Sequence, residues 1–144
     1  MEMLRLLPEQ ISRHWELIHE VLENVNMSGT LFDQDIITKI AEKLVSGQVQ
    51  CWVINDDKKL AAFVFTSIIS DSITGIKNLL LIGVYTFHTA SDINIWKKGL
   101  ISLQKFARGN SCRNVVFYTN VPELIQIANR FGANTEFVFG VFPT

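Results

Sequence analysis

Residues 114–142 read NVVFYTNVPELIQIANRFGANTEFVFGVF and contain a complete change of hydrophobic period. The run 114–119 is short, apolar and β-branched, which is typical of a buried strand. Pro122 suits the first turn of a helix, and Gly132 suits the position just after its end. Residues 135–142 then return to an apolar strand pattern. The stretch therefore predicts a strand, a helix and a final strand.

The segment upstream, NLLLIGVYTF at 78–87, is nearly continuous in apolar residues, as a strand covered on both faces would be. Gly83 interrupts it, and an isolated glycine in a strand indicates a bulge or a close backbone approach. A helix follows and ends near Gly109. Its predicted inward face carries Trp96, Leu100, Leu103 and Phe106 or Ala107.

The N-terminal part predicts an edge strand at 2–7 and then two helices. Pro8 opens the first helix, of roughly four turns, with an apolar stripe of Ile11, Trp15, Ile18, Leu22 and Val25. The second helix is capped by Asp33 or Asp35 and stopped at 46–47. Its apolar positions are Ile36, Ile37, Ile40, Ala41 and Leu44.

The middle of the chain predicts a hairpin, because VQCWVI at 49–54 meets LAAFVFTSII at 60–69 across a polar turn. A second turn lies at 70–75. The expected element order is β-α-α-β-β-β-α-β-α-β. We therefore predict one α/β (α+β) domain over 1–144, with a mixed sheet and helices on both faces.

Composition narrows the class of protein. The net charge is −1 with scattered Lys and Arg, so no basic footprint for nucleic acid is present. The longest apolar run, 60–69, is about half of what a bilayer crossing needs, and the N-terminus shows no signal-peptide pattern. Cys51 and Cys112 are expected to be free thiols rather than a disulfide or metal ligands. These features predict a cytoplasmic protein without nucleic-acid or membrane partners.

The element order resembles the GNAT fold of the Gcn5-related N-acetyltransferases, and 114–142 carries the best match. That family often shows a strand, an Asn, a short helix and a Gly; here these are Asn120 and Gly132. The resemblance implies acetyl transfer from acetyl-CoA to an amine. A shorter likeness, Asn120 with Gly132-Ala133, is to the GNAT-like small internal virion proteins of short-tailed phages. It implies a virion location if the chain is phage-encoded.

The resemblance also implies a cofactor site. The main chain of the bulged fourth strand, here Gly83, Val84 and Tyr85, would bind the pantetheine arm of acetyl-CoA. A loop of the type Q/R-x-x-G-x-G/A would then bind the pyrophosphate at the start of the third helix. The backbone amides of Ile93 and Asn94 are the matching donors in this sequence.

That loop should fall on 91–96, and it departs from the family pattern. Ser91 stands for the leading Arg or Gln, and Asn94 and Trp96 stand for the two small residues. Asp92 adds a negative charge where a phosphate would approach. We therefore predict that the pyrophosphate site is lost, with the indole packed into the core. If it is instead altered, Thr89, Ser91, Lys97 and Lys98 are further candidate donors.

The catalytic residues of the family are also replaced. The position of its usual tyrosine acid is Ala128, and the strand at 79–87 has no carboxylate base. His88 is the candidate base, because its unperturbed pKa lies near neutrality. Tyr85 and Tyr118 are the candidate acids. The alternative to these catalytic roles is that His88 is simply solvated and that the two tyrosines are aromatic side chains packed in or beside the core.

Three functional hypotheses follow. The first is a non-catalytic GNAT-fold protein that acts by contact with a protein partner or with itself. The second is a divergent acetyl-CoA-dependent N-acyltransferase acting on a small amine or a peptide amine. The third is a binder of another small molecule. Only twelve residues follow Gly132, enough for one strand, so we expect self-association or docking at an open sheet edge or through Phe137, Phe139 and Phe142.

Overall fold

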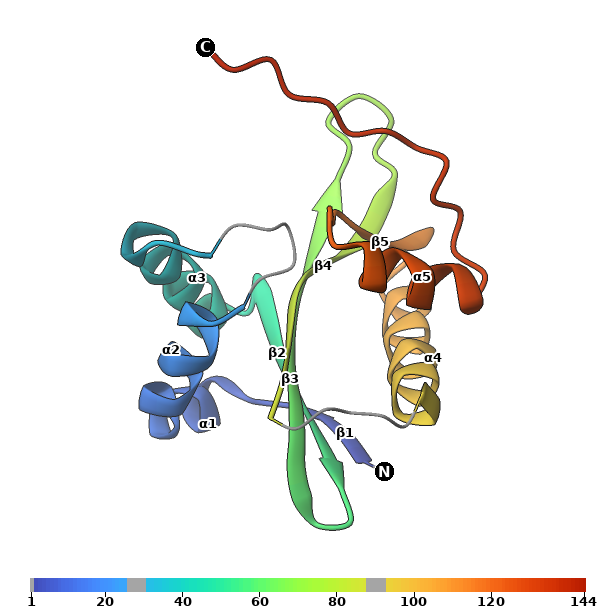
Figure 1. The fold of residues 1–144 in the computed structure, drawn as a ribbon. Helices are drawn as coiled ribbons and strands as arrows, with labels where there is room; N and C mark the ends of the chain where they lie inside the picture. Colours follow the sequence, from blue (N-terminus) through green and yellow to red (C-terminus); the bar gives the residue numbers. More distant parts are fainter. Residues whose placement is uncertain (1, 26–30, 88–92) are drawn as a thin grey trace.

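The computed structural model describes residues 2–25, 31–87 and 93–144. It contains one mixed sheet in the order β1-β2-β3-β4-β5, with antiparallel pairs from β1 to β4 and a parallel β4–β5 pair. Helices α1, α2 and α3 cover one face, and α4 and α5 lie on the other (Figure 1). In chain order the elements are β1 (Glu2–Arg5), α1 (Pro8–Arg13), α2 (Trp15–Glu23), α3 (Gln34–Ser46), β2 (Val49–Asp56), β3 (Lys59–Ser70), β4 (Lys77–Thr86), α4 (Ile93–Gly109), β5 (Asn114–Phe117) and α5 (Pro122–Arg130).

The predicted first helix is two helices, α1 and α2. They meet at His14, whose φ of −109° and ψ of 22° are not helical. Pro8 opens α1 as predicted, and the Gln10 side chain accepts a hydrogen bond from the Leu7 N–H at 2.8 Å. The apolar stripe survives the break, because the side chains of Ile11, Ile18, Leu22 and Val25 are all buried and Trp15 is half-buried.

Helix α3 follows its predicted signals closely. The Asp33 side chain accepts a hydrogen bond from the Ile36 N–H at 2.8 Å, which caps the first turn. Gly47 ends the helix with a φ of 84°, a left-handed conformation that glycine adopts without a Cβ penalty. The buried face is narrower than predicted, because Ile36 is 41% exposed while Ile37, Ile40 and Leu44 are buried.

The hairpin of β2 and β3 turns through Asp57 and Lys58, which both have positive φ. Such a pair is the signature of a two-residue turn whose twist matches that of the flanking strands. The next turn is held by Asp71, whose carboxylate accepts hydrogen bonds from the N–H groups of Ile73 and Thr74, both at 2.8 Å. Both predicted turns are therefore confirmed.

Two apolar layers sandwich the sheet. The layer under α1, α2 and α3 includes the stacked rings of Phe63 and Phe65, which are both buried. The layer under α4 includes Trp52, whose ring meets Phe106 edge-on at 5.0 Å. Cys51 and Cys112 are free and buried, as predicted. Within the described residues, no helix combines the length and the apolarity that crossing a membrane requires.

Helix α4 buries Leu103 and Ala107 as predicted, but the N-terminal half of its buried face is shifted by one residue from the predicted one. Its buried residues are Ile95, Gly99, Leu103 and Ala107, spaced by four. Trp96 and Leu100 are half-buried beside this face. A Cβ on Gly99 would lie 3.6 Å from Ile54 Cδ1, an ordinary contact distance, so this turn of the helix lies against the sheet. The prediction that the Trp96 indole packs into the core is wrong.

The predicted final strand at 135–142 is also wrong. No residue after α5 is in a strand, and Phe137 and Phe142 are 85% and 98% exposed. A sequence of apolar, β-prone residues becomes a strand only when its main chain pairs with another strand, and residues 135–142 pair with none of the described strands. The structure therefore keeps the predicted order up to α5 and splits the first helix in two.

Candidate functional site

The centre of the site is a bulge in β4. Gly83 pairs with Phe65, but the next pair along is Leu81 with Thr66, so Ile82 is an extra residue on β4. The predicted bulge at the strand glycine is confirmed. The close neighbour is a side chain rather than a backbone, because a Cβ on Gly83 would collide with Cγ1 of Val25.

The bulge reverses which face of the sheet each β4 residue meets. Before it, Leu79 and Leu81 pack in the layer under α4. After it, Val84 packs in that layer, while Ile82 and Tyr85 pack in the layer under α1, α2 and α3. Without the extra residue, strict alternation would place Tyr85 with Leu79 and Leu81.

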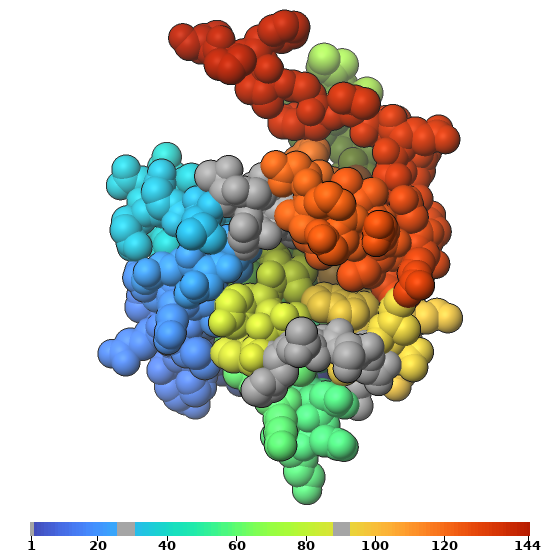
Figure 2. Space-filling view, viewed as in Figure 1, coloured from blue at the N-terminus to red at the C-terminus, as the bar shows by residue number. Residues whose placement is uncertain are grey.

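Beyond the bulge, β4 continues after β5 has ended. The last parallel pair is Leu81 with Phe117, whereas the pairing of β4 with β3 continues to Thr86. We call this region the β4–β5 opening: residues 82–86 of β4 together with Phe117 and Tyr118. Figure 2 shows the C-terminal part of β4, in yellow-green, at the surface between the blue N-terminal helices and the orange α5.

The direction of the main-chain groups in the opening follows from the β3 ladder. The Phe87 N–H donates to the Ala61 carbonyl at 3.0 Å, so Phe87 points its main-chain groups toward β3. Groups of alternate residues in an antiparallel strand point to opposite neighbours. The N–H and C=O of Val84 and Thr86 therefore face the side on which β5 has ended.

The candidate residues on β4 and β5 lie around this opening with different orientations. Tyr85 is half-buried, and its ring meets Phe87 edge-on at 5.2 Å in the layer under α1, α2 and α3. Tyr118 directly follows β5, is 49% exposed, and its ring lies 4.9 Å from that of Phe139. His88 lies outside the described residues.

The candidate phosphate-binding residues lie at the start of α4. Ile93 and Asn94 are its first two described residues, and both are exposed. The register predicted for the loop at 91–96 is corrected, because residues from Ile93 onward are helical. Thr89, Ser91 and Asp92 lie outside the described residues. Lys97 and Lys98 are exposed on α4.

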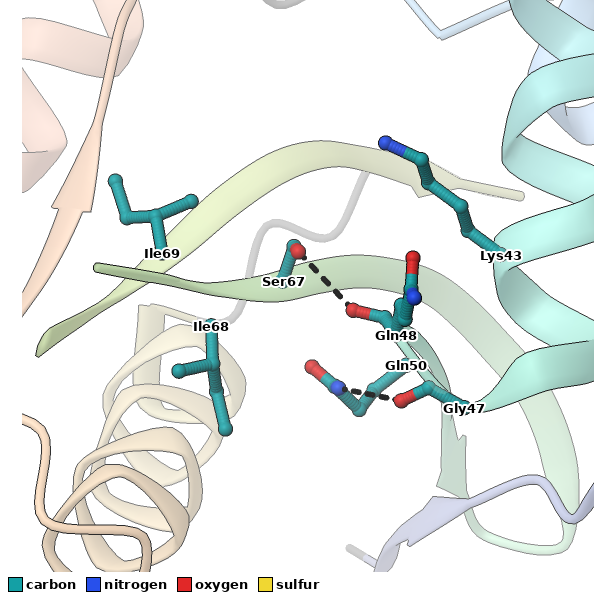
Figure 3. A pocket seen from close by; sticks show the side chains of 7 residues that line it. All are labelled: Lys43, Gly47, Gln48, Gln50, Ser67, Ile68 and Ile69. Atoms are coloured by element: carbon teal, nitrogen blue, oxygen red, sulfur yellow. Dashed lines mark hydrogen bonds between the residues drawn. The ribbon is translucent and has the colours of Figure 1, made fainter. Parts of the chain in front are cut away.

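A polar hollow that the sequence did not predict lies elsewhere. It has a volume of about 410 Å³ and is lined by Lys43, Gly47, Gln48, Gln50, Ser67, Ile68 and Ile69 (Figure 3). The Ser67 hydroxyl donates to the Gln48 carbonyl at 3.0 Å, and Gln50 Nε2 donates to the Gly47 carbonyl at 3.2 Å. These side chains bond the local main chain, so they hold the ends of β2 and β3 together. The one signal in the sequence was a glutamine inside an apolar strand.

Gln50 continues into a buried network that crosses the two central strands. The Trp52 indole N–H donates to the Thr66 hydroxyl at 2.9 Å, and that hydroxyl donates to Gln50 Oε1 at 2.9 Å. Thr66 is fully buried and Gln50 nearly so. Among the residues that the structure describes, no buried side-chain nitrogen or oxygen lacks a hydrogen-bond partner, so this network stabilises the sheet.

Solved structures are similar to this chain, whereas no protein-family model and no curated protein sequence matches it. A crystal structure of a probable acetyltransferase has a TM-score of 0.73 at 16% identity, and the match covers 100% of this chain and 99% of that one. The ribosomal-protein-alanine N-acetyltransferase of Brucella melitensis biovar Abortus 2308 has a TM-score of 0.70 at 16% identity, with 100% of both chains covered.

A third similar structure is AAC(6')-Iy in complex with the bisubstrate analog CoA-S-monomethyl-acetylneamine. Its TM-score is 0.71 at 14% identity, and the match covers 99% of this chain and 97% of that one. Identities this low show the fold alone. The mixed five-stranded sheet, the bulged fourth strand and these neighbours agree on one architecture. The chain has the GNAT fold, that of the Gcn5-related N-acetyltransferases.

Proposed function

We propose that this protein binds an acyl-CoA in the β4–β5 opening and transfers the acyl group to an amine of a small molecule or peptide. The observation that carries the proposal is that β4 extends past the end of β5 after the bulge. An extended ligand arm with amide groups can pair with the main chain of Val84 and Thr86, beyond the end of the β5 pairing, as an added strand would. The pantetheine arm of coenzyme A is such a ligand.

The start of α4 supports the same ligand. The first N–H groups of a helix have no intrahelical partner, and the helix dipole places partial positive charge there. Ile93 stands at this end of α4, and the exposed Lys97 and Lys98 add charge close by. This end of α4 suits the diphosphate, although the family's glycines are replaced.

For the chemistry, Tyr118 is the stronger candidate acid of the two tyrosines. Bound acyl-CoA supplies a thioester carbon for attack by the amine and a thiolate that must be protonated on departure. Tyr118 lies at the end of β5 with its ring half-exposed, where its hydroxyl can donate that proton. Tyr85 packs in the opposite layer against Phe87. His88 stays the predicted base.

A non-catalytic role is the second candidate. Two observations favour it: Ala128 occupies the family's tyrosine position, and β4 from Lys77 to Thr86 carries no carboxylate. In this role the protein acts by contact with another chain or with itself. The predicted likeness to phage virion proteins belongs here and depends on residues 120–133 alone.

Calorimetry and a thiol-release assay test the proposal. Acetyl-CoA should give a saturable binding heat, and a panel of small amines and peptide N-termini should reveal at least one that releases coenzyme A. Tyr118→Phe should then lower kcat by about 10²–10⁴-fold with binding of acetyl-CoA unchanged. Tyr85→Phe is the matched control and should retain the activity.

The outcomes separate the two candidates. Binding of acetyl-CoA without release of coenzyme A to any amine supports the non-catalytic role. No binding heat with millimolar acetyl-CoA contradicts the proposed ligand altogether.

A further inference from the structure

The polar hollow at the ends of β2 and β3 contains hydrogen-bonding groups that the fold does not use. The side chains of Lys43 and Gln48 make no hydrogen bond or ion pair with any residue that the structure describes. Figure 3 shows the Lys43 side chain extending from α3 toward the hollow, with the Gln48 amide beside it. Ser67 and Gln50, in contrast, are bonded to the main chain and hold the wall of the hollow in place. The hollow therefore combines a fixed wall with two unused donors.

The charge in the hollow favours an anionic group. Lys43 brings a full positive charge, and none of the seven residues that line the hollow is acidic. The C-terminal end of α3 carries partial negative charge, but carbonyls there are already bonded. The Lys43 carbonyl accepts from Ser46 Oγ at 3.1 Å, and the Leu44 carbonyl accepts from the Gly47 N–H at 3.3 Å. A carboxylate in the hollow can accept from the Lys43 ammonium and the Gln48 amide, and bonds between charged groups are the stronger kind.

The hollow and the β4–β5 opening are joined by a strip on one face of the sheet. Ser67 lies on the face covered by α1, α2 and α3, because Phe65, two residues earlier, packs in that layer. Ser67 pairs with Leu80, which shares this face. Two residues further along β4 is Ile82, the extra residue of the bulge, which packs in the same layer. Ser67, Leu80 and Ile82 are all only half-buried, so the strip leads from the hollow to the opening along the surface of the sheet.

The length of this strip matches a short peptide. Residues along a strand are about 3.3 Å apart and neighbouring strands about 4.8 Å apart, which places Ser67 about 8 Å from the bulge at Ile82. An extended peptide spans about 3.3–3.6 Å for each residue, so two or three residues cover this distance. With the diphosphate of an acyl-CoA at the start of α4, beyond the end of β4, the thioester lies at the other end of the opening, beside the bulge.

We propose that the hollow binds the carboxylate of the acyl acceptor, and that this acceptor is a dipeptide or tripeptide. The inference rests on the proposed function and names its substrate class. The carboxylate accepts hydrogen bonds from Lys43 and Gln48, while Ile69 contacts the apolar part of the peptide. The α-amine at the other end reaches the thioester carbon. There the nitrogen forms the new amide bond and loses a proton, the carbon–sulfur bond breaks, and coenzyme A leaves as a thiolate that takes up a proton.

The carboxylate site can be tested without acetyl-CoA. In NMR spectra of the labelled protein, alanyl-alanine should shift the side-chain amide signal of Gln48 in a saturable way, whereas its C-terminal amide should leave that signal in place. Lys43→Gln should raise the Kd for alanyl-alanine by about tenfold, as loss of a charged hydrogen bond would. Lys39→Gln is the matched control, because Lys39 is exposed on the same helix and does not line the hollow. Equal shifts with the dipeptide and its amide, or no shift with tens of millimolar dipeptide, overturn the proposal.

An assay of thiol release then separates this inference from the proposed function. With acetyl-CoA, kcat/KM for alanyl-alanine should exceed that for its amide by about tenfold, and Lys43→Gln should remove the difference through KM rather than kcat. Free alanine, in which the amine and the carboxylate are too close together, should be a poor acceptor. Transfer at equal rates to the dipeptide and its amide overturns the carboxylate site and leaves the proposed function in place. Binding of alanyl-alanine at Gln48 without transfer to any amine overturns the acceptor assignment together with the proposed function.

Discussion

The contact between Gly83 and Val25 explains why the bulged strand carries a glycine, and it can be measured. A Cβ on Gly83 collides with Val25 Cγ1, and Val25 is 1% exposed, so its side chain has little room to move. Overpacking of this kind costs about 1–3 kcal/mol. Replacing Gly by Ala also lowers the conformational entropy of the unfolded chain, which stabilises the native state by about 0.4–1 kcal/mol. We expect Gly83→Ala to lower the free energy of unfolding by about 1–2 kcal/mol, measured in urea by linear extrapolation.

A double-mutant cycle gives this prediction its control. Val25→Ala alone should cost about 1.5–3 kcal/mol through lost burial and a cavity. In that background the methyl of Gly83→Ala fills space that Cγ1 has left, so the double variant should be more stable than the sum by about 1–2 kcal/mol. Gly109→Ala, where a Cβ meets no atom within 4 Å, should be neutral or stabilising. If Gly83→Ala lowers the free energy of unfolding equally in the wild type and in the Val25→Ala background, the collision with Val25 is not what excludes a side chain at position 83.

Two further predictions concern buried groups of the sheet. Thr66→Val leaves the Trp52 indole N–H and Gln50 Oε1 without their partner and should lower the free energy of unfolding in urea by about 1–3 kcal/mol. Thr38→Val, on the exposed face of α3, is the control and should change this free energy little. Equal effects of the two substitutions would contradict the role of the network. Burial raises the pKa of the Cys51 thiol to about 12, so it should resist iodoacetamide at pH 8 in the native protein and react in urea, as read by mass spectrometry. As the pH rises, the Cys51 thiol ionises in the unfolded chain before it does in the native protein. The contribution of Cys51 to stability is therefore complete below about pH 9 and is lost as the pH rises from there toward 12. Rapid labelling of native Cys51 would refute its burial.

Much of the fold could be predicted because its signals are local. Asp33, Gly47 and the polar turn at Asp57-Lys58 each mark a boundary through hydrogen bonds or backbone angles of a few neighbouring residues. Gly83 predicted the bulge in the same way, because an isolated glycine in a strand is a local signal. The Asn120–Gly132 spacing then led to the fold that the structural neighbours show.

The misses depend on contacts between distant residues. The N-terminal half of α4 buries Ile95 and Gly99, and Gly99 lies against Ile54, a contact that helical period alone does not reveal. The segment 135–142 has every local property of a strand, but a strand also needs an edge to pair with. The break at His14 is similar: the apolar stripe continues through it, so the pattern gave no sign of it.

The candidate site was predictable in its main chain and less so in its side chains. The resemblance pointed to Gly83, Val84 and Tyr85, and the first two lie at the bulge and the opening. The side chain of Tyr85 turns to the other layer because one extra residue, Ile82, reverses the alternation. A sequence does not reveal which of two neighbouring residues a bulge leaves unpaired.

Hydrogen exchange of individual amides, followed by NMR with and without acetyl-CoA, tests the central proposal most directly. The amides of Val84 and Thr86 face the β4–β5 opening, so saturating acetyl-CoA should slow their exchange by at least about tenfold, as closing a new hydrogen bond of about 1.4 kcal/mol would. The amides at the β2–β3 turn, far along the sheet, should keep their rates. Slower exchange at Val84 and Thr86 alone is the predicted result. Unchanged rates there with millimolar acetyl-CoA would contradict the account.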